Sequence, residues 1–181
     1  MHRRHLILAG LGSTLAGAAT LVWATTADEF RELKWEALVP ADWDPLKEFK
    51  GQDMAVGLPD TDPRAQALLA RLRAIWDAAP TVAALDGAKV RLPGFVVPLD
   101  ETAAGLTSFL LVPYFGACIH TPPPPSNQII HVHSKTPAAV RTMDPIWVRG
   151  TLKLERQNTA QGASGYRLDA AGIEPYTGPT R

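Results

Sequence analysis

Apolar residues recur at helical spacing between Asp62 and Pro80. Asp62 followed by Pro63 is typical of a helix N-terminus, because aspartate caps the first turn and proline fits the first helical position. The apolar positions that follow are Ala65, Leu68, Leu69, Leu72, Ile75 and Trp76. The pattern predicts an amphipathic helix that begins after Asp62 and ends by Pro80.

After Pro80 the pattern changes to short β-rich runs separated by glycine, proline and charged turns. These runs span Lys89–Pro98, Thr107–Val112, Asn127–Ser134, Ile146–Glu155 and Ser164–Leu168. Gly150 falls inside one run, where a glycine commonly marks a bulge or a tight bend at a barrel corner. We therefore expect a mainly β fold with one or two helices. It would be a small five-stranded OB-like barrel, or a compact sandwich, preceded by the amphipathic helix.

The N-terminus differs in composition from the rest of the chain. A basic start that contains Arg3-Arg4 precedes an uncharged run from Leu6 to Ala24, which is typical of a secretory signal. The length of this run also allows an uncleaved anchor in the inner membrane, and the arginine pair admits twin-arginine as well as general export. We interpret residues 1–24 as the signal, 25–60 as an irregular segment over the core, and 61–181 as one β-rich domain with its leading helix. The expected location is the periplasm.

The charge balance narrows the class of partner. The whole chain carries 18 basic and 18 acidic residues, and removal of Arg3 and Arg4 with the signal leaves 16 basic against 18 acidic. A surface that binds nucleic acid or anionic lipid needs a basic patch. We therefore expect no nucleic acid, and a small ligand or another protein as the partner.

Cysteine and histidine are concentrated in one short window. Cys118 is the only cysteine, although an exported protein enters an oxidising compartment where cysteines are usually paired. Once the signal is removed, every histidine also lies between Cys118 and His133. They form two pairs, Cys118 with His120 and His131 with His133, each with one residue between its members.

This spacing suits a metal site on a sheet. Alternate residues of a strand point to the same face, so each pair can aim at one point while Ile119, Ile130 and Val132 turn to the opposite, apolar side. One thiolate and two or three imidazoles are a ligand set for zinc, and they also suit copper(I). The candidate metal ligands are Cys118, His120, His131 and His133.

Other roles for the window stay open. Pro122–Pro125 favours a stiff, extended loop between the two pairs, and the amides of Asn127 and Gln128 could fix a ring or a backbone turn. Cys118 could pack in the core while the proline loop binds a peptide, a glycan or a partner protein. A Cys/His hydrolase is disfavoured, because the β context of Cys118 supplies neither a helix N-terminus nor a neighbouring cation to activate it.

Three segments carry a resemblance to a known family. They are Gly94–Leu99, Phe109–Pro125 with its Cys-Ile-His-x-Pro-Pro-Pro-Pro signature, and Asn127-Gln128. The chain resembles, from about Trp35 to Tyr176, the bacterial exported family catalogued as domain of unknown function 3299. The family has no established reaction, but some members are encoded beside zinc-regulated ABC-transporter genes. Cys118 and His120 lie within the signature, whereas His131 and His133 follow it.

Together these features predict a periplasmic metal-binding accessory protein rather than an enzyme. Zinc is the expected ion and copper(I) the alternative. The protein would support metal uptake or homeostasis as a carrier, docking partner or sensor, with transporter components of the periplasm or inner membrane as its partners. A purely structural zinc, which would only support folding, is a further alternative.

Overall fold

The computed structural model describes residues 29–50, 58–59, 61–100, 102–118 and 123–178. Its strands are β1 (Arg31–Glu32), β2 (Lys89–Pro98), β3 (Leu106–Val112), β4 (Ile130–Ala138), β5 (Pro145–Lys153), β6 (Gln157–Thr159), β7 (Gly162–Ser164) and β8 (Tyr166–Pro175). Its helices are α1 (Pro63–Asp77) and the short 3₁₀ turns η1 (Trp35–Leu38), η2 (Lys47–Phe49), η3 (Ala83–Leu85) and η4 (Ser126–Gln128). The segment interpreted as a signal, residues 1–24, lies outside the described residues.

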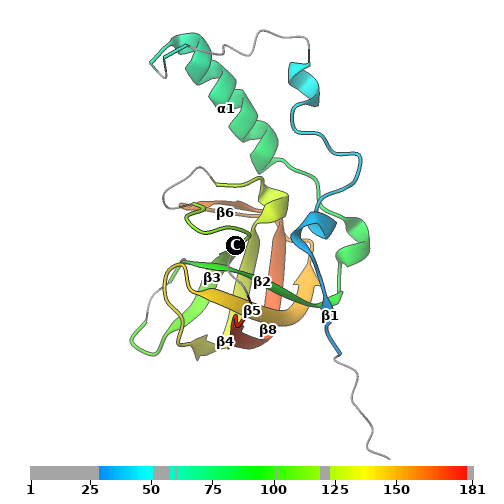
Figure 1. Cartoon of the computed structure of the whole chain (residues 1–181), viewed down its shortest axis with the longest axis vertical. Helices are drawn as coiled ribbons and strands as arrows, with labels where there is room; N and C mark the ends of the chain where they lie inside the picture. The colour runs from blue at the N-terminus through cyan, green and yellow to red at the C-terminus, as the bar shows by residue number, and fades with distance from the viewer. Residues whose placement is uncertain (1–28, 51–57, 60, 101, 119–122, 179–181) are drawn as a thin grey trace, which may run out of the picture.

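Five strands close into a barrel, which confirms the predicted fold class (Figure 1). The ring runs β2, β3, β4, β8 and β5, and the pairing of β5 with β2 closes it. The contact between β4 and β8 is parallel, and the other contacts of the ring are antiparallel. This is the strand order of an OB-like Greek-key barrel, so the alternative of a sandwich is not formed. β1 pairs with β2 outside the ring.

The barrel interior is filled by alternate residues of each strand. β4 shows the rule, because Ile130 and Val132 belong to the main core cluster whereas His131 between them does not. β3 contributes Phe109 and Leu111 to the same cluster. Because the inward positions of the strands form the core, their outward positions are available for other roles.

Gly150 bends β5 where it crosses β8. The register of the two strands shifts between Arg149 and Gly150. A Cβ at position 150 would lie 2.3 Å from the carbonyl oxygen of Asp169 and 2.6 Å from Leu168 Cδ2, so a side chain has no room there. The expectation that this glycine marks a bulge or bend is confirmed.

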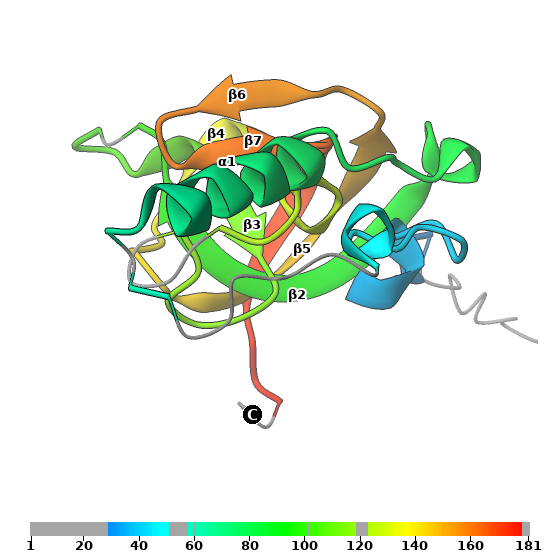
Figure 2. The ribbon, with the colours of Figure 1, turned by 90° about the horizontal axis from the view of Figure 1, so that it is seen from above.

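Helix α1 begins as the sequence predicts. The Asp62 carboxylate accepts a hydrogen bond from the Arg64 backbone N–H at 2.8 Å, and Pro63 occupies the first turn. Viewed from above, α1 crosses one end of the barrel beside the β6–β7 hairpin (Figure 2). The guanidinium of Arg156 donates to Ala79 O at 2.7 Å and to Ser126 Oγ at 2.9 Å, which ties the end of the helix to the turn before β4.

The segment before α1 is anchored to the barrel by specific hydrogen bonds. Trp35 Nε1 donates to Pro93 O at 2.7 Å, and Leu38 is fully buried in the core cluster. The buried Tyr166 hydroxyl donates to Leu38 O at 2.8 Å and accepts from the Val82 backbone N–H at 2.7 Å. Within the part of the chain that the structure describes, no helix has the length and apolar character needed to cross a membrane.

Candidate functional site

His131 and His133 lie side by side on the outer face of β4. Their ring centroids are 4.1 Å apart and their planes are inclined by 40°. His131 is only 6% exposed, and His133 is half-buried. The prediction that these two side chains share one face of a strand is therefore confirmed.

Neighbouring strands add polar groups around the two rings. Ser108 of β3 pairs in register with His133, and its Oγ lies 2.7 Å from His131 Nε2. On the other side of β4, Arg167 of β8 pairs with His131 and Asp169 pairs with His133. The outer faces of three adjacent strands thus form one polar patch around the imidazoles.

One nitrogen of each ring has no partner within normal hydrogen-bond geometry among the described residues. His131 Nδ1 and His133 Nε2 are both buried, and no described residue hydrogen-bonds to either atom. Buried polar nitrogens are nearly always paired with protein or water. The Ser108 hydroxyl can accept from the Nε2–H of His131, and in that tautomer the lone pair of the ring lies on the unpartnered Nδ1.

The environment keeps both rings neutral. Burial is the main cause that lowers the pKa of His131, and the charge of His133 acts in the same direction. A hydrogen-bond interaction of the Gln157 side chain with the ring opposes this shift, although no described group lies within normal hydrogen-bond geometry of Nδ1. Burial also lowers the pKa of His133, assisted by the positive charge of Arg167. Neutral imidazoles have a lone pair to offer, which is the state that a metal ligand needs.

The charges around the histidines balance one another. Arg167 forms ion pairs with Asp169 at 2.9 Å and with Glu155 at 3.2 Å. Lys153 also pairs with Asp169, at 2.7 Å. Two cations therefore face two carboxylates, which offset part of the positive charge that Arg167 places beside the rings.

Asp100, in the loop between β2 and β3, holds the serine in place. Its carboxylate accepts hydrogen bonds from the backbone N–H of Thr107 at 3.1 Å and of Ser108 at 3.0 Å, and from the Thr107 hydroxyl. Burial acts to raise the pKa of Asp100, but these hydrogen bonds outweigh it and keep the pKa below its ordinary value. The loop thereby fixes the group that orients His131.

Cys118 lies in a turn, and the strand conformation expected for it is wrong. Its φ is +65°, and Gly116, two residues before it, has a φ of +85°; an extended strand allows neither value. The thiol is partly buried and packs against an apolar cluster that contains Leu110, the residue paired with His131. Burial raises the pKa of Cys118 to about 11, so the thiol is protonated at neutral pH. That is the opposite of what a nucleophilic cysteine requires.

The four candidate ligands are thus only partly brought together. His131 and His133 are adjacent, Cys118 lies by the apolar cluster next to them, and His120 lies outside the described residues. Among the residues that are described, no three His, Cys, Asp or Glu side chains are arranged to hold a metal ion.

The amides next to the proline run serve the fold. Asn127 Nδ2 donates to Pro80 O at 3.0 Å, and Gln128 Nε2 donates to Trp35 O at 2.7 Å. Both side chains therefore take one of the roles expected for them, that of fixing backbone.

Comparison with known proteins gives a family but no activity. A family described as a protein of unknown function, DUF3299, matches residues 35–175. The crystal structure of a DUF3299 family protein from Pseudomonas aeruginosa PAO1 is similar at 41% identity and a TM-score of 0.63, over 83% of this chain and 99% of that one. A small single-stranded DNA-binding protein from Streptomyces coelicolor is 17% identical, with a TM-score of 0.33 over 50% of this chain and 95% of its own. No curated protein matches.

Proposed function

The chain belongs to the DUF3299 family of proteins of unknown function, and from that premise we propose that it is a periplasmic metal-binding accessory protein. Zinc is the ion that the donor types suit best. The protein would take part in metal uptake or homeostasis, with transporter components as the partners. The observation that carries this proposal is the pair of buried, unpartnered nitrogens on the adjacent rings of His131 and His133.

The details of the patch support a ligand role for these two atoms. Because Ser108 can occupy Nε2 of His131, the ring would bind a metal through Nδ1, and His133 would bind through Nε2. A hydrogen bond to the second nitrogen of a ligating histidine is a common feature of metal sites, since it fixes the tautomer and the ring orientation. Burial already keeps both rings neutral, so neither needs to lose a proton before it binds.

Two histidines alone do not complete a zinc site. Zinc prefers four ligands, of which nitrogen and sulfur are the usual donors. Cys118 and His120 are the further ligands that we propose, and the thiol of Cys118 must then lose its proton on binding, because its pKa is raised to about 11. The same soft sulfur would suit copper(I), which makes copper(I) the second candidate ion.

The first experiment measures the stoichiometry of zinc in purified, reduced protein by elemental analysis. We expect about one zinc per chain, and a loss of binding in His131→Ala and His133→Ala. Trp147→Ala is a matched control, because it removes a ring from the outer face of β5 outside the patch. Full zinc content in both histidine variants would refute the site.

The second experiment counts the protons that zinc binding releases, by calorimetry in buffers of different ionisation enthalpy. If the Cys118 thiolate becomes a ligand, about one proton should be released per zinc at neutral pH. The Cys118→Ser variant should release about one proton fewer. A wild-type protein that binds zinc without releasing a proton would keep the histidines as ligands and exclude Cys118.

A third experiment separates a carrier from a structural zinc site. The described barrel has a complete apolar core on its inner face, and the histidines lie on the outer face. A chelator should therefore remove the metal while the circular dichroism spectrum of the folded protein persists. Unfolding that accompanies metal loss would indicate a structural zinc instead.

A further inference from the structure

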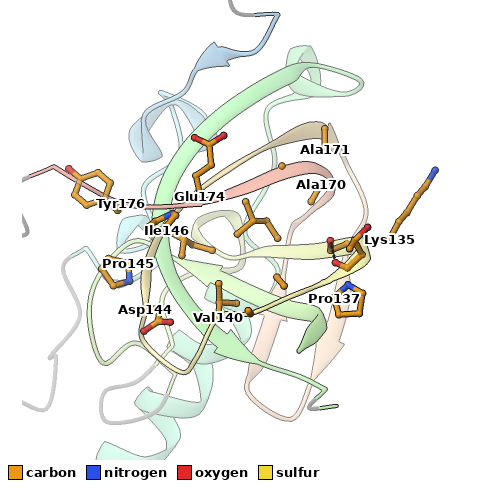
Figure 3. Close-up of a pocket in the computed structure, with 17 residues that line it drawn as sticks. Lys135, Pro137, Val140, Asp144, Pro145, Ile146, Ala170, Ala171, Glu174 and Tyr176 are labelled. Atoms are coloured by element: carbon orange, nitrogen blue, oxygen red, sulfur yellow. Dashed lines mark hydrogen bonds between the residues drawn. The ribbon is translucent and has the colours of Figure 1, made fainter. Parts of the chain in front are cut away.

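A cleft opens at the end of the barrel where β4 and β8 separate (Figure 3). The two strands are paired only as far as Ser134 and Ala170. Beyond these residues they diverge, and the segment 139–146 closes the third side of the space between them. The cleft has a volume of about 670 Å³, within the range of ligand-binding pockets, which is about 300–1,000 Å³.

The cleft exposes an unpaired strand edge. From Gly172 to Pro175, β8 pairs with β5 on one side, and none of the strand pairings of the described residues covers its other side. In an antiparallel pair, every second residue points its backbone N–H and C=O away from its partner strand. Some of the backbone hydrogen-bonding groups of this segment therefore face the cleft.

The cleft also offers apolar contacts and a charge at each end. Glu174 lines it too, but its carboxylate is paired with Arg149. Ile146, Val140 and Ile173 line it, which gives alternate side chains of a ligand an apolar surface. Lys135 follows Ser134 at the end where the two strands separate. Asp144 lies at the opposite end, next to Pro145, whose carbonyl accepts from the Tyr176 backbone N–H at 3.0 Å. Figure 3 shows Lys135 and Asp144 on opposite sides of the cleft.

We propose that this cleft binds an extended polypeptide segment, which adds to β8 as an antiparallel strand. The two charges relate the charge order of a bound segment to the direction in which it runs. β8 runs from the Lys135 end of the cleft to the Asp144 end. A segment that runs opposite to β8 therefore has its amino end near Asp144 and its carboxyl end near Lys135. A basic residue near the amino end and an acidic residue near the carboxyl end match both charges only in this direction. This site is separate from the histidine patch, and the proposal does not depend on metal binding.

The test uses a defined peptide as the probe. Acetyl-Arg-Val-Thr-Val-Glu-amide is titrated into the nitrogen-15-labelled full chain, and backbone amide shifts are followed by NMR. We expect saturable shifts in Lys135–Val140 and Ala171–Glu174. The same peptide with its Arg and Glu exchanged should bind about two- to fivefold more weakly, the range of exposed ion pairs. A copy methylated at alternate backbone nitrogens should bind at least about fivefold more weakly, because it cannot complete the strand hydrogen bonds.

Variants of exposed residues keep the test independent of folding. Lys135→Glu should abolish or reverse the preference of the protein for the original peptide over the peptide with Arg and Glu exchanged. Lys34→Glu makes the same change at an exposed position outside the cleft, and should leave this preference intact. Ala139→Trp should fill the cleft and weaken the probe's binding. The proposal is overturned by the absence of saturable shifts, by equal binding of the methylated peptide, or by a charge preference that Lys135→Glu does not change.

Discussion

The hydrogen bond between Ser108 and His131 gives the sharpest prediction about the proposed metal site. Ser108→Ala removes the hydroxyl that lies 2.7 Å from His131 Nε2 and leaves the ring with no group to fix its tautomer there. Loss of such a supporting partner lowers metal affinity by about 10- to 100-fold. On the free-energy scale this is about 1.4–2.7 kcal/mol of binding. The effect should be this large because Asp100 fixes the backbone of Ser108, which keeps its hydroxyl within reach of the His131 ring.

The affinity is measured by competition for zinc against a chromophoric chelator at neutral pH. Ser108→Thr retains the hydroxyl on a residue that suits a strand and should bind nearly as well as the wild type. Ser134→Ala is a matched control, because the Ser134 hydroxyl donates only locally, to Thr136 O at 2.6 Å. If Ser108→Ala binds zinc as tightly as the wild type, then Ser108 does not orient His131 and the assignment of Nδ1 as the ligand atom is wrong.

Two further predictions concern stability. Tyr166→Phe removes a buried hydroxyl that makes two hydrogen bonds, and should lower the free energy of unfolding by about 2–4 kcal/mol in urea denaturation. A loss below about 0.5 kcal/mol, the range of ordinary surface substitutions, would contradict this. His131 and His133 have lowered pKa values in the fold, so their stabilisation is present above the ordinary histidine pKa of about 6.5 and is lost as the pH falls towards the lowered values. As the pH is lowered through this window, the urea midpoint should fall less steeply in the double variant His131→Gln/His133→Gln than in the wild type. If the two slopes are equal, these histidines are not the source of the pH dependence of stability.

The sequence predicts the ring of strands well because its alternation is strong. The bounds of β2 are those expected, Lys89–Pro98, and the inward positions of this strand are uniformly apolar. The sequence does not predict the β6–β7 hairpin, because the alternation of apolar and polar residues there is weak. Its strands, Gln157–Thr159 and Gly162–Ser164, are three residues long and mostly polar, so they present too few alternations to be recognised.

The error at Cys118 comes from applying a strand period where the chain turns. The pattern of alternate ligand types is the same in the two pairs, but only His131 and His133 lie on a strand. Gly116, two residues before the cysteine, is the signal that could have corrected the prediction, since its φ of +85° is a conformation that glycine adopts readily.

The polar groups around the histidines could not be found from the sequence. Ser108, Arg167 and Asp169 meet the two rings only through strand pairing, and the pairing of β4 with β8 is parallel, which joins segments distant in the chain. Local patterns carry no information on such long-range neighbours. Arg167 and Asp169 do have the spacing of a shared strand face, but that spacing is also typical of an ordinary solvated strand.

Because the side chains of each strand alternate between inward and outward positions, the residues that stabilise the barrel differ from those of the proposed site. On β4, Ile130 and Val132 point into the core, while His131 and His133 point outward. An outward substitution therefore leaves the barrel core intact, whereas a cavity at Ile130 or Val132 costs stability through lost packing. A histidine variant that loses zinc but keeps its urea midpoint at neutral pH would have lost a binding group and not a structural one. Because the proposed site is built on strands whose core is already complete, we expect that a bound metal ion could leave without unfolding the barrel, which is the property that a carrier needs.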